Sequence, residues 1–269
     1  PTTTVPSPGA SRRRTRSALI PRLVAWVPHN AIGAVVAKEL RYTWRDPRRR
    51  AALFGVVFAG VLPLVVFRSI AATNVRTCFI AVWPALNIGL NTNAFGFDGD
   101  RVWVDVAAGA SVADELRART LARFVSAVPV VLVLMAVLAA LAGSAAAVVP
   151  ALGAVAAALG IGAGFAAFLS VRAPFPMPDA GRGNAFGGAG AGQNASAGFA
   201  ALGAILVSGL LVTPLVLVSI ALPLASPWQS ALAAIGVAIG WLSWRVGIAV
   251  ATNWRLPDAP ALLATLTRV

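Results

Sequence analysis

Side chains that commonly carry out chemistry are scarce in this chain. It contains one cysteine (Cys78), one histidine (His29) and nine acidic residues among 269. One cysteine and one histidine exclude a disulfide framework, and they exclude a Cys/His metal cluster built from this chain alone. Neither the H-E-x-x-H nor the G-x-S-x-G pattern occurs, so the sequence does not support an intramembrane hydrolase.

The surroundings of the only lysine, Lys38, argue against nucleotide hydrolysis. A P-loop needs a glycine-rich turn before its lysine, and the preceding residues Ile32–Ala37 do not provide one. The glycine-rich stretch Gly181–Gly198 fails the G-x-G-x-x-G spacing, and we expect a flexible loop there. We therefore expect no catalytic residue, cofactor site or metal site, and we do not expect an enzyme.

The overall composition is that of a membrane protein. Hydrophobic residues make up 58% of the chain and charged residues 12%, and the mean hydropathy is +0.81. Basic residues outnumber acidic ones by 22 to 9. A nucleic-acid-binding protein could share this charge balance but not this hydropathy, so we expect the lipid bilayer and not a nucleic acid as the partner of the basic side chains.

The lengths of the apolar runs predict how often the chain crosses the bilayer. A hydrocarbon core about 30 Å thick requires about 20 apolar residues per helix, and strands are not expected because no alternation of period two appears. The predicted fold is therefore all-α: a polytopic membrane protein with six transmembrane helices. The predicted spans are Ala51–Phe67, Thr77–Phe97, two within Phe124–Val171 with a break near Gly143-Ser144, Phe199–Leu222, and Trp228 to about Val250.

The basic residues predict the orientation of this six-span arrangement. Both termini and the 98–123 and 172–198 loops fall on one side, and only Arg68 and Arg76 fall on the other. Cytoplasmic loops carry the excess of Lys and Arg. We therefore expect a multi-pass protein of the cell inner (cytoplasmic) membrane with both termini cytoplasmic.

An amphipathic helix is predicted before the first span. Ile32, Val36, Leu40 and Trp44 recur at i+4 spacing, which places an apolar stripe opposite the basic side chains. We expect this helix to lie in the membrane surface with the stripe facing lipid, and to stop at Asp46 before Pro47. Glu39 falls near the apolar edge, where a polar contact with another element would satisfy it.

A second helix start is predicted in the loop before the third span. Ser111 is a favourable N-cap, and Asp114 stands three residues later, close to the spacing of a capping box. Asp114 and Glu115 also complement the positive end of the helix dipole. The apolar run that follows Arg123 continues this helix into the third span, and we expect Asp114 and Glu115 to be exposed.

Polar and small residues within the spans have modest predicted roles. Asn87 and Asn91 lie one turn apart on the second span and could line a substrate pathway or bond a neighbouring helix, the second reading being favoured. Gly160/Gly164 and Gly236/Gly240 have the small-xxx-small spacing that allows close helix packing.

Three stretches resemble the permease subunits of type-2 ABC exporters, particularly large actinobacterial members. They are KELRYTWRDPRRR (Lys38–Arg50), NTNAFGFDGDRVW (Asn91–Trp103) and RAPFPMPDAGRGNAFGG (Arg172–Gly188). The resemblance implies a permease domain over residues 31–250 that begins with an elbow helix over 31–46. It also implies an ABC ATPase subunit as partner, together with a second permease half or a homodimer partner.

The resemblance assigns expected roles to two sets of residues. The expected elbow residues are Glu39, Arg41, Trp44, Arg45 and Asp46. The expected ATPase-coupling residues are Ser111, Asp114, Glu115, Arg117 and Arg119. We expect residues 1–30 to be a Pro/Ser/Arg-rich linker or tail and 251–269 a cytoplasmic tail. Because the chain begins at Pro1, we expect the second half of a double-length permease or another fragment.

Two other classes of function remain open at this point. An ion-coupled secondary transporter commonly places ionisable groups at membrane depth, whereas the acidic residues here fall outside the apolar cores of the spans. A membrane scaffold without transport activity is the other alternative. The acidic residues are Glu39, Asp46, Asp98, Asp100, Asp105, Asp114, Glu115, Asp179 and Asp258.

Overall fold

A computed structural model of the chain describes residues 27, 30–47, 49–50, 58, 75–90, 94–95, 98, 111–174 and 195–253. The regular elements within these residues are all helices, as the all-α prediction expects. They are α2 (Ala31–Arg45), the 3₁₀ helix η2 (Val75–Ala81), α5 (Val82–Gly89), α7 (Val112–Leu141), α8 (Val148–Arg172), α9 (Ala195–Ala221) and α10 (Trp228–Asn253).

Four of the described helices are long and apolar enough to cross a membrane. They are α7, α8, α10 and the Leu202–Ala221 part of α9, each 20 residues or longer. Twenty helical residues extend about 30 Å, the thickness of the hydrocarbon core. By length and composition, these four helices support a multi-pass membrane protein.

The predicted boundaries of these helices are close to the observed ones. The break within Phe124–Val171 is confirmed, because α7 ends at Leu141, α8 begins at Val148, and Gly143 in between has a φ of +64°. A positive φ is readily available only to glycine, which explains the turn at this position. The helix start at Ser111 is also confirmed, since the Ser111 Oγ accepts a hydrogen bond of 3.1 Å from the Asp114 N–H.

The second predicted span is shorter than expected. Its helical part consists of η2 and α5 and ends at Gly89, eight residues before the predicted end at Phe97. Leu90, Ala94, Phe95 and Asp98 are in turns. The reason is local: the residues after Leu90 include Asn, Thr and Gly, which favour turns over helix. The first predicted span, Ala51–Phe67, lies outside the described residues apart from Phe58.

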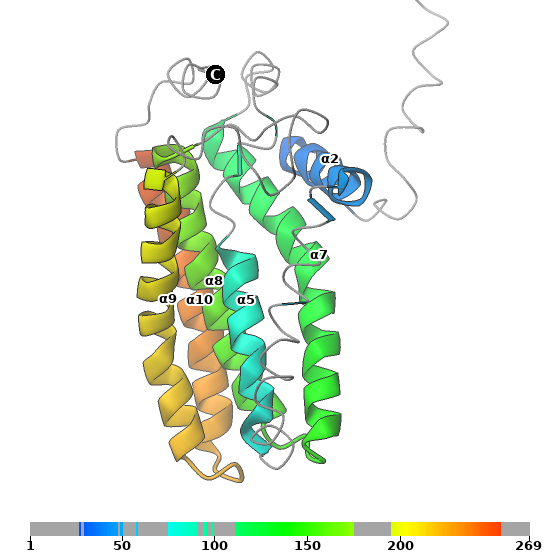
Figure 1. Cartoon of the computed structure of the whole chain (residues 1–269), viewed down its shortest axis with the longest axis vertical. Coiled ribbons are helices and arrows are strands. Elements are labelled where there is room, and N and C mark those ends of the chain that lie inside the picture. Colours follow the sequence, from blue (N-terminus) through cyan, green and yellow to red (C-terminus); the bar gives the residue numbers. More distant parts are fainter. Residues whose placement is uncertain are drawn as a thin grey trace, which may run out of the picture.

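The centre of the bundle is α8. It packs against α10, α5 and α9, and α7 runs along the other side of α5 (Figure 1). Gly160 of α8 meets the backbone of Gly240, and Gly236 of α10 meets the backbone of Gly153, so no room remains for a Cβ at either position. The close packing predicted from the glycine spacing is therefore confirmed for α8 and α10.

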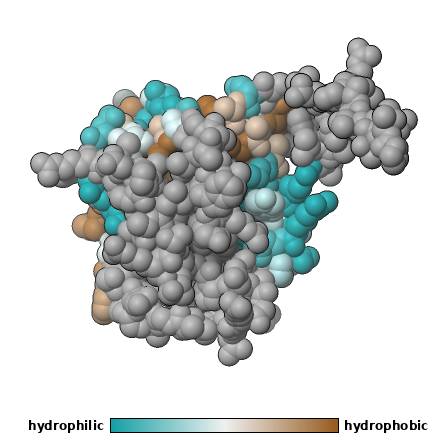
Figure 2. All heavy atoms as spheres, turned by 90° about the horizontal axis from the view of Figure 1, so that it is seen from above, coloured by the Kyte–Doolittle hydropathy of each residue, from teal (hydrophilic) through white to brown (hydrophobic). Residues whose placement is uncertain are grey.

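Helix α2 lies across the end of the bundle at which α7 begins (Figure 1). Its Val36 and Leu40 are buried together with Ala118 and Ala122 of α7. The expectation that the whole apolar stripe faces lipid is therefore wrong, because part of the stripe packs on α7. Trp44, the last residue of the stripe, is 69% exposed. From this end of the molecule, hydrophilic described residues are visible on two sides, with hydrophobic ones between them (Figure 2).

Candidate functional site

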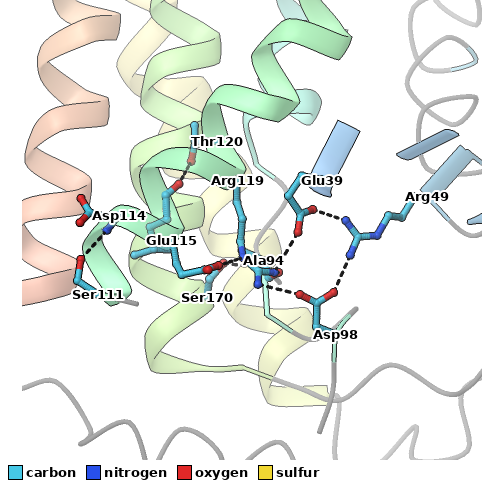
Figure 3. Close-up of polar contacts among 11 residues, drawn as sticks. Glu39, Arg49, Ala94, Asp98, Ser111, Asp114, Glu115, Arg119, Thr120 and Ser170 are labelled. Carbon is cyan, nitrogen blue, oxygen red and sulfur yellow. Dashed lines mark hydrogen bonds and ion pairs between the residues drawn. The ribbon is translucent and has the colours of Figure 1, made fainter. Parts of the chain in front are cut away.

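Five charged side chains from separate parts of the chain meet between α2 and the first turns of α7. They are Glu39 of α2, Arg49, Asp98, and Glu115 and Arg119 of α7, here called the charge network (Figure 3). At most 11% of any of these side chains is exposed. Charged side chains are almost never fully buried unless they are paired, as they are here.

Arg119 is at the centre of the charge network. Its Nη2 lies 2.7 Å from Asp98 Oδ2, its Nε lies 2.8 Å from Glu115 Oε2, and its Nη1 lies 3.6 Å from Glu39 Oε1. The guanidinium also lies over the ring of Phe95, with 4.9 Å between Cζ and the ring centroid. A planar guanidinium with five donors can satisfy several acceptors at once, which the single ammonium of lysine cannot do in the same geometry.

Arg49 closes the other side of the charge network. Its Nη1 donates to Glu39 Oε2, and its Nη2 lies 2.9 Å from Asp98 Oδ1. Glu39 and Asp98 therefore each lie between two arginines (Figure 3). Arg123, one turn beyond Arg119, is attracted by Glu39 and repelled by both of these arginines.

Backbone groups extend the charge network to α8. Arg119 Nη1 donates a hydrogen bond of 2.7 Å to the carbonyl oxygen of Ala94, and the Ala94 N–H donates one of 2.9 Å to Ser170 Oγ of α8. Ser170 is fully buried. The turn after α5 is thereby tied both to α7 and to α8, so one buried cluster joins four segments that are distant in sequence.

The outer side of the first turn of α7 has a different character. Asp114 and Arg117 form an ion pair of 3.0 Å, and 44% of each side chain is exposed. Asp114 therefore pairs with Arg117 while its N–H binds the Ser111 cap. Glu115, in contrast, is 4% exposed. The expectation that both acids are exposed is wrong for Glu115, because it is turned inward to pair with Arg119.

The structure brings together only some of the residues singled out from the sequence. Glu39, Glu115 and Arg119 meet in the charge network, and Glu39 has the expected contact with another element. Arg45 and Trp44 are exposed at the end of α2, Arg41 is half-buried, and Asp46 caps that helix through its N–H to the Tyr42 carbonyl.

The two asparagines of the second span do not form a shared site in the described part of the chain. Asn87 donates to the carbonyl of Trp83 in its own helix, at 2.9 Å, rather than to a neighbouring helix. Asn91 lies outside the described residues. Neither a substrate pathway nor an interhelical bond is therefore assigned to this pair.

Sequence reasoning missed two members of the charge network, Arg49 and Asp98. Arg49 stands within a run of three arginines that reads as an ordinary basic flank, and Asp98 stands at the end of an apolar run. Their positions in the sequence could have identified them. Both residues border apolar segments, where an unpaired charge costs free energy, so each is expected to have a partner of opposite charge.

The contacts described for the charge network position α2, the turn after α5 and α7 relative to one another. Among the described residues, no group of three or more His, Cys, Asp or Glu side chains could hold a metal ion. Comparison of the chain with protein-family models, curated proteins and solved structures finds no match. The function of the chain is therefore inferred from the geometry of the charge network and from the resemblance of its sequence to exporter permeases.

Proposed function

We propose that this chain is the permease subunit of an ABC exporter, which moves a substrate across the cytoplasmic membrane with ATP hydrolysed by a separate subunit. Two lines of support are independent. The first is the resemblance of the stretches beginning at Lys38, Asn91 and Arg172 to type-2 exporter permeases. The second is the arrangement of α2, α7 and the charge network.

The single observation that carries the proposal is the continuity of α7. This helix runs from its cap at Ser111 through charged turns into an apolar segment, over 30 residues or about 45 Å, with Pro129 inside it. A proline inside a helix removes one backbone hydrogen bond and favours a kink, so the rigid part is the segment before Pro129. That segment joins the charged turns to the start of the apolar segment and can transmit a displacement from one to the other. A coupling element of an ATP-driven transporter requires this property.

The charge network makes α2 part of the same rigid unit. Because Glu39 pairs with both Arg49 and Arg119, a movement of the first turns of α7 must carry α2 with it or break buried ion pairs. Removing one partner from a buried pair typically costs about 3–5 kcal/mol. The two helices are therefore expected to move together when an ATPase subunit acts on α7.

The exposed face of the first turn of α7 is the proposed contact for the ATPase subunit. Ser111, Asp114 and Arg117 lie there, whereas Glu115 and Arg119 face inward. The outward residues are polar and of both signs, as at the rim of a protein interface. Of the five expected coupling residues, three are thus available to a partner and two position the helix.

The locations of the buried acids favour this proposal over an ion-coupled transporter. Glu39, Asp98 and Glu115 pair with arginines at the end of the bundle where α2 lies (Figure 3), and not at half the length of the spans. Ion-coupled transporters commonly bind their ions near the midplane. A non-transporting scaffold is the alternative that the experiment below must separate.

The test is site-specific photo-crosslinking in native membranes. A photoreactive amino acid is placed at Arg117, on the proposed contact face, and as a matched control at Ser144, in the turn between α7 and α8 at the opposite end of the bundle. We expect Arg117 to crosslink to a chain that carries a P-loop ATPase sequence, and Ser144 not to do so. Peptide mass spectrometry identifies the product.

A functional arm uses the single variant Asp114→Arg in membrane vesicles. The variant changes an exposed side chain, so membrane yield and the unfolding midpoint should stay unchanged. We expect the crosslink at Arg117 and ATP-dependent transport to fall together. A chain that crosslinks only to proteins without an ATPase domain, or transport that is driven by an ion gradient without ATP, would contradict the proposal.

A further inference from the structure

An apolar groove of about 350 Å³ lies on the surface of the bundle between α8, α9 and α10. Its volume is within the range of small-molecule sites, about 300–1,000 Å³. Phe165 and Phe168 of α8, Leu211 of α9 and Val246 of α10 contribute its walls. Apart from Ser243, all of its lining residues are apolar or glycine, so the groove suits a hydrocarbon chain.

Glycines create the floor of this groove. Gly164 of α8 and Gly247 of α10 both line it, and their backbones touch, so that a Cβ on Gly247 would collide with Gly164. Two helices in backbone contact leave a concave strip beside the contact, and α9 reaches it with Leu211. The groove is thus a direct result of the packing that holds α8 against α10.

The length of the groove fits within one leaflet of a bilayer. On α8 its lining residues run from Ile161 to Phe168, and Arg172 ends the helix one turn later. The seven-residue step from Ile161 to Phe168 extends about 10 Å, less than half of a hydrocarbon core, about 15 Å. The groove therefore covers part of the path of one acyl chain, between the middle of α8 and the turn before Arg172.

A cation stands at the mouth of the groove. The exposed Arg172 guanidinium lies over the ring of Phe168, with 5.9 Å between Cζ and the ring centroid, and Phe168 itself lines the groove. Arginine carries five N–H donors in a planar fork that matches a phosphate group. Arg172 also belongs to the end of the bundle at which α2 and the charged turns of α7 lie (Figure 1).

We propose that this groove binds an anionic phospholipid from the leaflet at the α2 end, with one acyl chain along Phe165 and Phe168 and its phosphate at Arg172. An apolar strip on the surface of membrane-length helices, with a guanidinium one turn beyond it, favours a lipid over a soluble ligand. Basic pockets between membrane helices recognise anionic headgroups by the same charge complementarity. The proposal holds whether or not the chain belongs to an exporter.

The test uses a phosphatidylglycerol that carries a diazirine in one acyl chain. The full chain is reconstituted into liposomes of phosphatidylglycerol and phosphatidylcholine, irradiated and digested, and the adducts are located by mass spectrometry. We expect adducts within 161–168 of α8 and 243–250 of α10. Adducts spread evenly over the lipid-facing residues of α7, α9 and α10 would overturn the proposal.

Two pairs of matched variants make the test specific. Val246→Trp fills the groove, whereas Leu242→Trp introduces the same side chain in the preceding turn of α10, outside the groove; both positions are more than half exposed. Arg172→Gln removes the cation at the mouth, whereas Arg245→Gln removes an arginine that stacks on Trp241 of α10 in the same way, 5.4 Å from its ring centroid, away from the groove.

The expected pattern separates the two parts of the lipid. Val246→Trp should abolish the adducts in the groove and Leu242→Trp should leave them. Arg172→Gln should lower the adduct yield about tenfold, as the loss of a charge-assisted hydrogen bond implies, and Arg245→Gln should leave it nearly unchanged. Equal yields for the two arginine variants, with unfolding midpoints unchanged, would overturn the headgroup assignment.

A second copy of the chain is the competing occupant of the groove. A cysteine at Val246, in a Cys78→Ala background, would then form a disulfide-linked dimer in membranes under mild oxidation. We expect no such dimer and protection of this cysteine by added phosphatidylglycerol. Efficient dimer formation would show that protein, not lipid, covers the groove.

Discussion

At the scale of single residues, Arg119 determines how α2, α7 and the turn after α5 are joined. It contacts Asp98 and Glu115 and lies 3.6 Å from Glu39, and 3% of the residue is exposed. Burying charges costs free energy of desolvation, so such a cluster contributes little net stability over a well-packed apolar one. We expect its effect to be on specificity, favouring the one arrangement of these segments in which all of these charges are paired.

Replacing Arg119 by methionine should therefore be severe. The change leaves the carboxylates of Asp98 and Glu115 buried without their main partner, which typically costs about 3–5 kcal/mol. For a chain of this size the unfolding midpoint should fall by roughly 6–20 °C. Thermal unfolding in detergent, followed by circular dichroism, provides the measurement.

The control for this prediction is the neighbouring arginine. Arg117→Met removes the ion pair with Asp114, in which 44% of each side chain is exposed. Exposed ion pairs contribute about 0–1 kcal/mol, so the unfolding midpoint should stay nearly unchanged. Adding Asp98→Asn and Glu115→Gln to Arg119→Met should restore part of the loss, because it removes the unpaired charges. Equal midpoints for Arg117→Met and Arg119→Met would show that the charge network does not hold these segments together.

At the scale of the elements, the contact between α8 and α10 is the closest in the bundle. Two glycines of each helix lie against the backbone of the facing helix: Gly153 and Gly160 of α8, and Gly236 and Gly240 of α10. Within a bilayer, burial from water cannot drive helices together, so close van der Waals packing of small residues takes its place. The same contact produces the floor of the groove beside α9.

A single methyl group should disrupt this contact. In Gly160→Ala the new Cβ collides with the backbone of Gly240, so α8 and α10 must separate, and overpacking of this kind costs about 1–3 kcal/mol. Gly209→Ala of α9 is the matched control, because a Cβ there meets no atom within 4 Å. Alanine is the better helix former by about 1 kcal/mol, so this control should be neutral or slightly stabilising.

The two variants are compared by their unfolding midpoints at equal detergent concentration. We expect a lower midpoint for Gly160→Ala than for the wild type and an equal or higher one for Gly209→Ala. A destabilised Gly209→Ala, or a Gly160→Ala of wild-type stability, would contradict the packing described for α8 and α10.

At the scale of the whole molecule, the helix ends define two sides. The start of α7 and the ends of α8 and α10 lie at the end that carries α2, and the turns between α7 and α8 and between α9 and α10 lie at the other (Figure 1). Most of the described basic residues lie toward the first of these ends, whereas Arg76, near the start of η2, lies toward the other. By the positive-inside rule this end is expected to face the cytoplasm.

Cysteine accessibility tests this orientation. In a Cys78→Ala background, single cysteines at Ser144 and Ser226 should react with a membrane-impermeant thiol reagent in intact cells, and one at Ser111 should react only after the membrane is opened. All three positions lie in turns or at a helix cap. Labelling of Ser111 in intact cells, with protection of Ser144, would reverse the proposed orientation. The remaining positions that would test the six-span prediction lie outside the described residues.

The amino-acid sequence by itself determined where most of the membrane helices lie. Apolar runs near 20 residues long located α8, α9 and α10, because the thickness of the bilayer sets the length of a span. Local capping chemistry at Ser111 and the break predicted near Gly143-Ser144 located the ends of α7. These features depend on residues a few positions apart, so they can be predicted from the sequence without knowledge of the tertiary structure.

Only the tertiary structure decided what each helix faces. The stripe of α2 reads as lipid-facing, but its Val36 and Leu40 pack on α7, because a protein interior and a bilayer are equally apolar and select the same side chains. The charge network likewise joins Glu39, Asp98 and Arg119, which are separated by dozens of residues. Which buried charges pair across such distances depends on how the helices pack, and no local spacing encodes it.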